Sequence, residues 1–373
     1  IHAPAADVDG PIALSLEELD AGEVLVIDAP PGLAVLMRAQ ATGAAAVISA
    51  SLEHYNVDPG GGQRHLDAIQ FRTLPVGTSI PVAMISARSL EAIRAARKAD
   101  PGARIAFQAD VRFDERPLRT LMARVVGSDR PGEAVVVGSH VQEPGACDNA
   151  SGVAGLCESA VGLAGLIQSG RIERPSRSLV FLWGDEFRQT ETWLDQTELV
   201  PIAGLSSDMT GESAATGAMA LLERMPDPGA VEPLAPDEHT LWGKAEVDAT
   251  SLEPNGLAVI ARSALIDVAS AAGGWKTAEH PYEGGSDHDV FIAHGVPAAL
   301  FWHFTDFTYH TSMDRTEFVD PQEMRRTGTA LMTTALALAD PRPADLERYL
   351  ATLNQELKTR VAVGGTGAGG DDT

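Results

Sequence analysis

Near-continuous apolar runs recur along the chain from about residue 119 onward, and each is typical of a strand that is covered on both faces. They lie at residues 134–138, 178–183 and 298–302. Ser151 is expected to cap a helix over 152–169, which stops at Gly170. A second helix is predicted from Asp320 to about Asp340. This order of elements predicts an α/β core.

The first hundred-odd residues carry shorter elements. β-like runs at 23–28, 45–49 and 80–85 are separated by helical patches at about 33–43 and 88–99. This pattern predicts a separate small α/β module.

The last residues, 363–373, are rich in glycine and low in complexity. Because no strand precedes these glycines, we expect a flexible tail and not a nucleotide-binding loop.

The charge of the chain narrows the choice of partners. Its 373 residues include 28 Lys and Arg against 52 Asp and Glu, a formal net charge of −24. Such a chain repels phosphate backbones and anionic lipids, so neither nucleic acid nor a membrane surface is an expected partner. We expect no membrane-spanning segment, because no apolar run approaches the roughly 18–20 residues that a membrane span needs. The assembly state is left open, a homo-oligomer included.

The two cysteines, Cys147 and Cys157, make no disulfide framework. The chain starts at Ile1 with no recognisable targeting pattern. The compartment therefore stays open, with a secreted or periplasmic location slightly favoured over a cytoplasmic one.

Polar residues of metal-binding type follow the apolar runs. His140 ends the first run, Asp185 and Glu186 end the second, and Asp208 follows a shorter apolar stretch at 202–205. Because ligands of open α/β sheets bind at the carboxyl ends of the strands, we expect these side chains to meet in one place.

Two more residues extend this set. Asp148 follows a Pro-Gly turn directly before a predicted helix, whose positive end would keep it ionised. The loop after the strand at 298–303 would return His310 to the same edge of the sheet. Histidine nitrogen with carboxylate oxygen, and no paired cysteine, fits zinc or a similar divalent ion in an open catalytic site. Such sites hydrolyse their substrates.

The motifs around these residues occur in a recognisable order. They are GSH at 138–140, CDNASG at 147–152, the acidic pair after FLWG, SSDMTGE at 206–212, GGSDHDVF at 284–291 and YHTSMD at 309–314. In this order the chain resembles the di-zinc aminopeptidases of metallopeptidase family twenty-eight, over about residues 134–320. The resemblance implies a zinc-exopeptidase-like fold, with a mixed, mostly parallel sheet flanked by helices.

The resemblance also implies a role for each matching residue. Asp148 would bridge two zinc ions, His140 and Asp208 would complete one site, and Glu186 and His310 the other. Asp185 would be the general base, and Tyr309 would polarise the scissile carbonyl or steady the oxyanion. Other divalent metals, such as cobalt or manganese, are possible.

The chain departs from the family pattern at two places. The orienting acid expected two positions after His140 is Gln142, with Glu143 beside it, and the expected Glu-Glu pair is Asp185-Glu186. The side chain of the general base would therefore be one methylene shorter than in the family pattern, and its carboxylate would lie further from the attacking water.

Three other polar residues belong around the site. Asp287 and His288 are expected to support the loop that carries His310 through hydrogen bonds. Glu212 is either a solvated loop acid or a group that binds a free α-amine.

The segment from GEVLVID to IPVAMISARSLEAI, about residues 22–112, resembles the protease-associated domain often inserted in exopeptidases. An unrelated small α/β domain is the alternative. The predicted organisation is a protease-associated-like domain at 1–118, a di-metal peptidase domain at 119–362 and the tail at 363–373.

The combined prediction is a metal-dependent aminopeptidase that removes N-terminal residues from peptides through a metal-activated water. A carboxypeptidase, an amidohydrolase or a glutaminyl cyclase on the same scaffold is the first alternative, and the cyclases resemble the family with a single zinc. A non-catalytic binding protein is the second, but all five ligand positions are filled, which argues against it. The chain has neither the G-x-S-x-G turn of serine hydrolases nor the H-E-x-x-H helix of other zinc peptidases.

Overall fold

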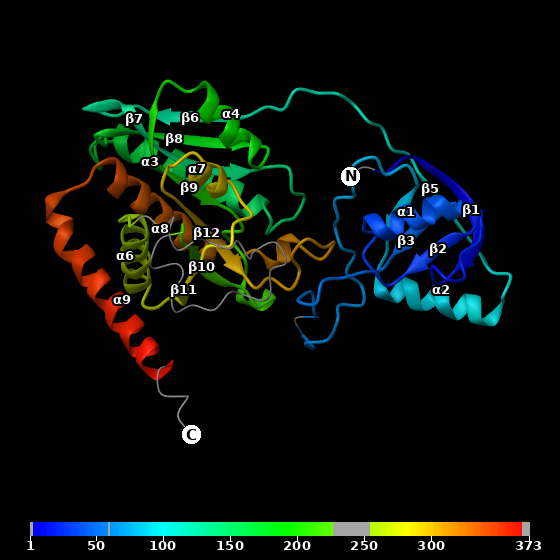
Figure 1. Ribbon diagram of the computed structural model, residues 1–373. Helices are drawn as coiled ribbons and strands as arrows, with labels where there is room; N and C mark the ends of the chain where they lie inside the picture. The colour runs from blue at the N-terminus through cyan, green and yellow to red at the C-terminus, as the bar shows by residue number, and fades with distance from the viewer. Residues whose placement is uncertain (1–2, 59, 227–253, 368–373) are drawn as a thin grey trace. The chain divides into compact units, whose positions relative to one another are not determined.

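The computed structural model describes residues 3–58, 60–226 and 254–367, and the chain divides into two compact units (Figure 1). The smaller unit comprises residues 1–117 with 306–315, and the larger unit comprises 118–305 with 316–373. Tyr309 and His310 therefore belong to a segment that groups with the smaller unit.

The smaller unit is built on a five-stranded sheet in the order β4-β3-β2-β1-β5. Its strands are β1 (Ala6–Ala13), β2 (Val24–Ile27), β3 (Ala46–Ser49), β4 (Val82–Met84) and β5 (Arg104–Ala109). Its helices are α1 (Leu33–Thr42) and α2 (Ala87–Ala99). β1 to β4 pair in parallel, whereas β5 is antiparallel to β1. The structure thus has a small α/β unit here, and its likeness to a protease-associated domain stays a prediction.

The larger unit is built on a seven-stranded mixed sheet in the order β11-β10-β12-β9-β7-β8-β6. Its strands are β6 (Leu121–Val125), β7 (Arg130–His140), β8 (Arg177–Gly184), β9 (Val200–Ser207), β10 (Met219–Glu223), β11 (Thr277–His280) and β12 (Ala298–Phe304). Its helices are α3 (Ala150–Gln168), α4 (Arg188–Gln196), α6 (Leu257–Ala271), α7 (His288–Ala293), α8 (Pro321–Ala339) and α9 (Leu346–Gly367). Within this sheet β7 runs parallel to both of its neighbours, β8 and β9. The predicted α/β fold, with a mixed and mostly parallel sheet, is confirmed.

Both faces of this sheet are covered, as the unbroken apolar runs predict. Val135 and Val137 of β7 pack into one core cluster with residues of α3, α6 and α8, such as Leu156. Val136, between them, packs on the opposite face with Phe291 of α7. Alternate side chains of one strand thus enter two separate cores, which is why the run contains no polar residue.

The start of α3 lies close against the end of β9. A Cβ atom at Gly152 would lie 2.6 Å from the backbone oxygen of Ser207 and 2.1 Å from Oδ1 of Asn149, so only glycine fits this contact. Asn149 is the first flanking residue of the helix, and the hydroxyl of Ser151 donates to the carbonyl of Cys147 from inside it. The prediction that Ser151 caps this helix is therefore wrong by two residues. The helix predicted from Asp320 is confirmed, because its side chain accepts from the backbone N–H of Gln322.

By length and composition α3 could cross a membrane, with a mean hydropathy of 1.5. The expectation that no segment is long and apolar enough therefore fails for α3. Core helices of globular proteins pass the same test, and Leu156 and Leu163 of α3 belong to the larger core cluster of this unit.

At the C-terminal end of the chain, α9 continues to Gly367, so this helix includes residues 363–367 of the predicted tail. Residues 368–373 lie outside the described residues.

Candidate metal centre

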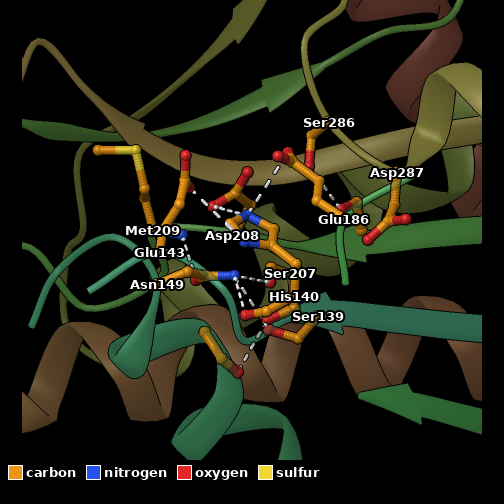
Figure 2. Close-up of polar contacts among 12 residues, drawn as sticks. Ser139, His140, Glu143, Asn149, Glu186, Ser207, Asp208, Met209, Ser286 and Asp287 are labelled. Carbon is orange, nitrogen blue, oxygen red and sulfur yellow. Dashed lines mark hydrogen bonds and ion pairs between the residues drawn. The ribbon is translucent and has the colours of Figure 1, made fainter. Parts of the chain in front are cut away.

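Three neighbouring strands deliver side chains to one edge of the large sheet. His140 is the last residue of β7 and pairs with Gly184 of β8. Glu186 lies two residues beyond Gly184, and Asp208 directly follows β9. The backbone N–H of Asp208 donates to the carbonyl of Phe301 in β12, which holds this acid at the strand edge. As the sequence predicts, parallel strands bring the imidazole between two carboxylates (Figure 2).

The distances define two overlapping groups of metal-ligand atoms, which we call the donor cluster: His140 with Glu186 and Asp208, and His140 with Glu143 and Asp148. Nε2 of His140 lies 3.0 Å from Oδ1 of Asp208 and 3.6 Å from Oε1 of Glu186. Nδ1 of His140 lies 3.6 Å from Oε2 of Glu143. Within each group the candidate ligand atoms lie within 4.8 Å of one another.

Burial makes this concentration of charge costly without a cation. His140 is 0% exposed and Asp148 is 3% exposed. Burial raises the pKa of the Asp148 carboxyl well above its ordinary value, and the neighbouring Glu143 raises it further. Burial also raises the pKa of Glu186 to about 9. Burial lowers the pKa of His140, but Asp208 and the other acids outweigh it and hold this pKa well above its usual range.

The donor cluster fits a divalent metal. Both ring nitrogens of His140 and Oδ1 of Asp208 are buried, and within the described part of the chain their contacts with one another and with the neighbouring acids are ion pairs that lack the alignment of a hydrogen bond. Buried polar atoms almost always have a hydrogen-bond partner, and metal coordination accounts for such exceptions. Imidazole nitrogen with carboxylate oxygens suits zinc and similar ions.

Gln142, which replaces the acid of the family pattern, orients Glu186. The amide Nε2 of Gln142 donates to Oε2 of Glu186 at 3.1 Å. The backbone N–H of Glu186 donates in return to Oε1 of Gln142 at 3.0 Å. The amide thus fixes both the backbone and the carboxylate of this acid.

Asn149 ties the strand ends together, a role that the sequence analysis missed. Its Nδ2 lies within hydrogen-bond distance of Oγ of Ser139 and the carbonyls of His140 and Ser207. Its Oδ1 accepts from the backbone N–H of Met209 at 2.9 Å (Figure 2). The signal was present in the sequence, because Asn149 adjoins Asp148 at the helix start. The side chain is 1% exposed, which excludes the N-glycosylation that its sequence context would permit.

Asp287 holds the backbone that follows Glu186. Its carboxylate accepts from the N–H of Phe187 at 3.0 Å, Nε2 of Gln189 at 2.6 Å and the hydroxyl of Thr190 at 2.8 Å. Phe187 has a positive φ of 59°, which costs energy for a bulky residue, and the hydrogen bond that its N–H donates to Asp287 stabilises this conformation.

The prediction that Asp287 and His288 support the loop of His310 stays a prediction, and the hydrogen bonds that these residues make within the larger unit have other partners. Asp287 bonds to residues 187–190, and Nε2 of His288 lies 2.9 Å from Oε1 of Glu223. The sequence could not show this, because Glu223 carries no motif.

Two other predicted residues lie outside the donor cluster. The carboxylate of Asp185 is 30% exposed and lies 3.7 Å from Nε of Arg188. Glu212 is 0% exposed, accepts from the N–H of Gly211 and lies 3.3 Å from Nδ1 of His303. The alternative that Glu212 is a solvated loop acid is therefore wrong.

Tyr309 and His310 are anchored within the smaller unit. Nδ2 of Asn56 donates to the carbonyl of Tyr309 at 2.9 Å, and Nε2 of Gln70 donates to the carbonyl of His310 at 2.9 Å. The predicted roles of Tyr309 and His310 at the metal centre stay predictions.

Comparison with known proteins identifies the family of the larger unit. The model of peptidase family M28 matches residues 120–186 and 246–335. No curated protein matches the chain.

Solved structures resemble the chain in fold. A peptidase M28 precursor from Shewanella amazonensis SB2B is 19% identical, covers 92% of this chain and 76% of its own, with a TM-score of 0.58. BSAP, a zinc aminopeptidase from Bacillus subtilis, is 18% identical, with coverages of 90% and 76% and a TM-score of 0.55. A Clostridium acetobutylicum protein with an inferred peptidase role is 15% identical with a TM-score of 0.52, and this chain covers 55% of that protein.

Fold, donor cluster and family match together define a metal-dependent peptidase. Its catalytic unit belongs to peptidase family M28, as the order of the sequence motifs indicates.

Proposed function

We propose that the protein is an aminopeptidase that removes N-terminal residues from peptides. The observation that carries this proposal is the buried, hydrogen-bond-deficient donor cluster around His140 at the ends of β7, β8 and β9. The zinc aminopeptidase of Bacillus subtilis, which shares the fold, supports the choice of reaction.

The proposed cofactor is a pair of zinc ions. His140, Asp148, Glu186 and Asp208 would hold them together with His310, and Glu143 is a further ligand candidate because it lies in the donor cluster. Bound divalent ions would polarise the scissile carbonyl and lower the pKa of a water.

The remaining roles fall to residues around the cluster. Asp185 would accept a proton from the attacking water and return it to the leaving amine. Tyr309 would steady the developing oxyanion. Gln142 and Asp287 would keep Glu186 in place through the hydrogen bonds described above. A secreted or periplasmic location is kept as a proposal on the sequence alone.

The test combines metal analysis with peptide hydrolysis. The purified protein is expected to hold two divalent ions per chain by plasma mass spectrometry and to release free amino acids from unblocked peptides but not from N-acetylated ones. His140→Ala should abolish both properties, whereas His294→Ala, at an exposed position, should change neither.

Each other result points to a rival. Equal release from blocked and unblocked peptides would exclude an aminopeptidase, and release from the C-terminal end would indicate a carboxypeptidase. One ion per chain with cyclisation of N-terminal glutamine would indicate a glutaminyl cyclase. Hydrolysis of non-peptide amides alone would indicate an amidohydrolase, and metal binding without hydrolysis a binding protein.

A further inference from the structure

The C-terminal helix α9 carries its apolar residues on an exposed face. Leu346, Leu350, Leu353, Leu357 and Val361 are 58%, 48%, 47%, 57% and 66% exposed. At 3.6 residues per turn they fall within an arc of about 80°, so they form one continuous stripe along the helix. We call these five residues the leucine stripe. Figure 1 shows α9, in orange to red, at the edge of the larger unit.

The inner face of α9 is polar instead. Thr352 shares a hydrogen bond of 2.8 Å with Ser263 of α6, and the buried Glu356 pairs with Arg224. Surface helices normally bury their apolar stripe and expose their polar face. In α9 the arrangement is reversed, and a contiguous exposed apolar patch of this kind marks an interaction surface.

We propose that the leucine stripe pairs with the same stripe of a second copy of this chain, as two antiparallel helices around a two-fold axis. The spacing favours a second copy as the occupant. Successive stripe residues are separated by 4, 3, 4 and 4 positions, the interval of a coiled-coil seam. A two-fold interface must be self-complementary, since any contact from one residue to a second residue of the other copy is repeated in reverse across the axis.

The stripe meets this condition. It is symmetric about the midpoint between positions 353 and 354, because Leu350 and Leu357 are equidistant from that point, and so are Leu346 and Val361. In an antiparallel pair, Leu350 would therefore pack on Leu357 of the partner subunit.

The charges beside the stripe select the antiparallel direction. Glu347 and Lys358 are exposed and lie on the same side of the stripe, about 100° and 120° around the axis from Leu346. Antiparallel pairing would bring Glu347 to within about one turn of Lys358 of the partner subunit. Parallel pairing would place the Glu347 and Lys358 side chains of the two copies on opposite flanks of the interface, where these charges could not pair.

The expected affinity is modest. One pair of helices about four turns long is at the lower end of specific interfaces, and both copies carry a net charge of −24. We expect a dissociation constant on the order of 10 μM that tightens with salt as the long-range repulsion is screened.

Sedimentation of the full chain from about 1 to 100 μM tests the proposal. The wild type should shift from monomer to dimer, and Leu350→Glu with Leu357→Glu should remain a monomer with an unchanged circular dichroism spectrum. Val161→Glu, at a 64% exposed position of α3, is the matched control and should still dimerise.

Charge reversal tests the direction of pairing. Glu347→Lys and Lys358→Glu should each weaken the dimer about 3- to 10-fold, and the double variant should restore it.

Crosslinking gives a second test of direction, in a Cys157→Ser background because Cys157 is exposed. Leu353→Cys, close to the axis, should oxidise to a covalent dimer, whereas Leu346→Cys should not.

Three results would overturn the proposal: a wild type that stays monomeric at 100 μM, a dimer that survives the Leu350→Glu and Leu357→Glu changes, or efficient crosslinking at position 346 with none at 353. The first would indicate that another part of this chain or a different protein covers the stripe. None of these measurements depends on peptidase activity, so the proposal and the proposed function can fail separately.

Discussion

The larger unit contains two buried clusters of histidine and acid that look alike in composition but differ in their hydrogen bonding. One is the donor cluster around His140. The other, the Glu223 cluster, consists of Glu223 at the end of β10 with His280 and His288. His288 and Glu223 are both 0% exposed, as is His140.

Three proton donors surround Oε1 of Glu223, whereas its Oε2 lies 3.6 Å from Nδ1 of His280. Its Oε1 accepts from the backbone N–H groups of Glu283 and Gly284 at 3.0 and 2.8 Å and lies 2.9 Å from Nε2 of His288. Burial alone would raise the pKa of Glu223, but hydrogen bonds from His280 and His288 outweigh it and lower this pKa. Two further carboxylates lie beside these imidazoles, because Oε1 of Glu283 is 3.7 Å from Nε2 of His280 and Oδ1 of Asp289 is 3.6 Å from Nε2 of His288, so two imidazoles face three carboxylates.

In the donor cluster the excess of acid is larger, because one imidazole faces four carboxylates. Burial and mutual repulsion raise the pKa of Asp148 and Glu186, so these acids are poorly stabilised by the protein alone. The comparison teaches that histidine and acid in proximity do not define a metal site. The larger excess of carboxylates over imidazoles in the donor cluster is what calls for a cation, which would balance the buried charge.

The sharpest test removes the centre of the donor cluster. His140→Ala is expected to lower metal affinity by more than about 100-fold, beyond the usual loss on removing a supporting residue, and to reduce hydrolysis to background. Titration with zinc and plasma mass spectrometry measure the first effect. Retained metal in this variant would show that the two clusters do not differ as described.

The converse test removes the charge of Glu223. Glu223→Gln is expected to lower the free energy of unfolding by about 3 kcal/mol, since the buried imidazoles of His280 and His288 lose the fully buried carboxylate between them, with the metal content unchanged. Urea unfolding measures this loss, and Glu198→Gln, at an exposed position, is the control. A loss of metal without a loss of stability would reverse the assignment of the two clusters.

The Glu223 cluster should also make stability depend on pH. Burial lowers the pKa of His280, but Glu223 outweighs it and raises this pKa to about 9. A histidine whose pKa is higher in the folded state stabilises fully below its unfolded value of about 6.5, and this contribution is lost as pH rises through 9. The wild type should therefore lose up to about 3 kcal/mol between pH 6.5 and 9.5 relative to His280→Asn. Parallel stability curves for the two proteins would contradict this.

A smaller effect is expected beside the donor cluster. Asp185→Asn should lower turnover by at least about 10²-fold, the scale of general-base catalysis, while both metal ions are retained. Initial rates at saturating peptide measure this loss, and Asp195→Asn, an exposed acid on α4, is the control. Full activity of the variant would exclude Asp185 as the base and direct attention to Glu143.

The smallest effect is expected at Gln142. Gln142→Ala removes both hydrogen bonds to Glu186 and should weaken metal binding about 10-fold. Gln142→Glu, which restores the acid of the family pattern, should retain the bond from the backbone N–H of Glu186 and lose the bond to its carboxylate. Calorimetric titration with zinc ranks the three proteins, and equal affinities would show that Gln142 does not orient the ligand.

The sequence predicted the buried strands of the larger sheet well, because both faces of β7, β8 and β12 demand apolar residues. It did not predict β6, an edge strand with exposed side chains, or β11, which has the polar sequence TAEH. In such strands the pairing partner, and not local pattern, determines the structure.

At the donor cluster, too, the sequence predicted what depends on local pattern and missed what depends on distant partners. His140, Glu186 and Asp208 were predictable because strand ends place them. The partners of Asp287 were not, because its bonds reach about 100 positions back along the chain to the turn after β8. Asp185 is a third case. The sequence motif predicts that it is the general base, but in the structure its carboxylate lies beside Arg188.

The position of β7 between two parallel neighbours has a consequence for protein engineering. Adjacent strands lie about 4.8 Å apart, and this repeat sets the lateral intervals between His140, Glu186 and Asp208. The hydrogen-bonded strands thus fix the spacing of these side chains, and this spacing does not depend on the length of the surrounding loops. Loops at this edge could therefore be exchanged or lengthened to admit new substrates while the intervals between these three side chains remain the same.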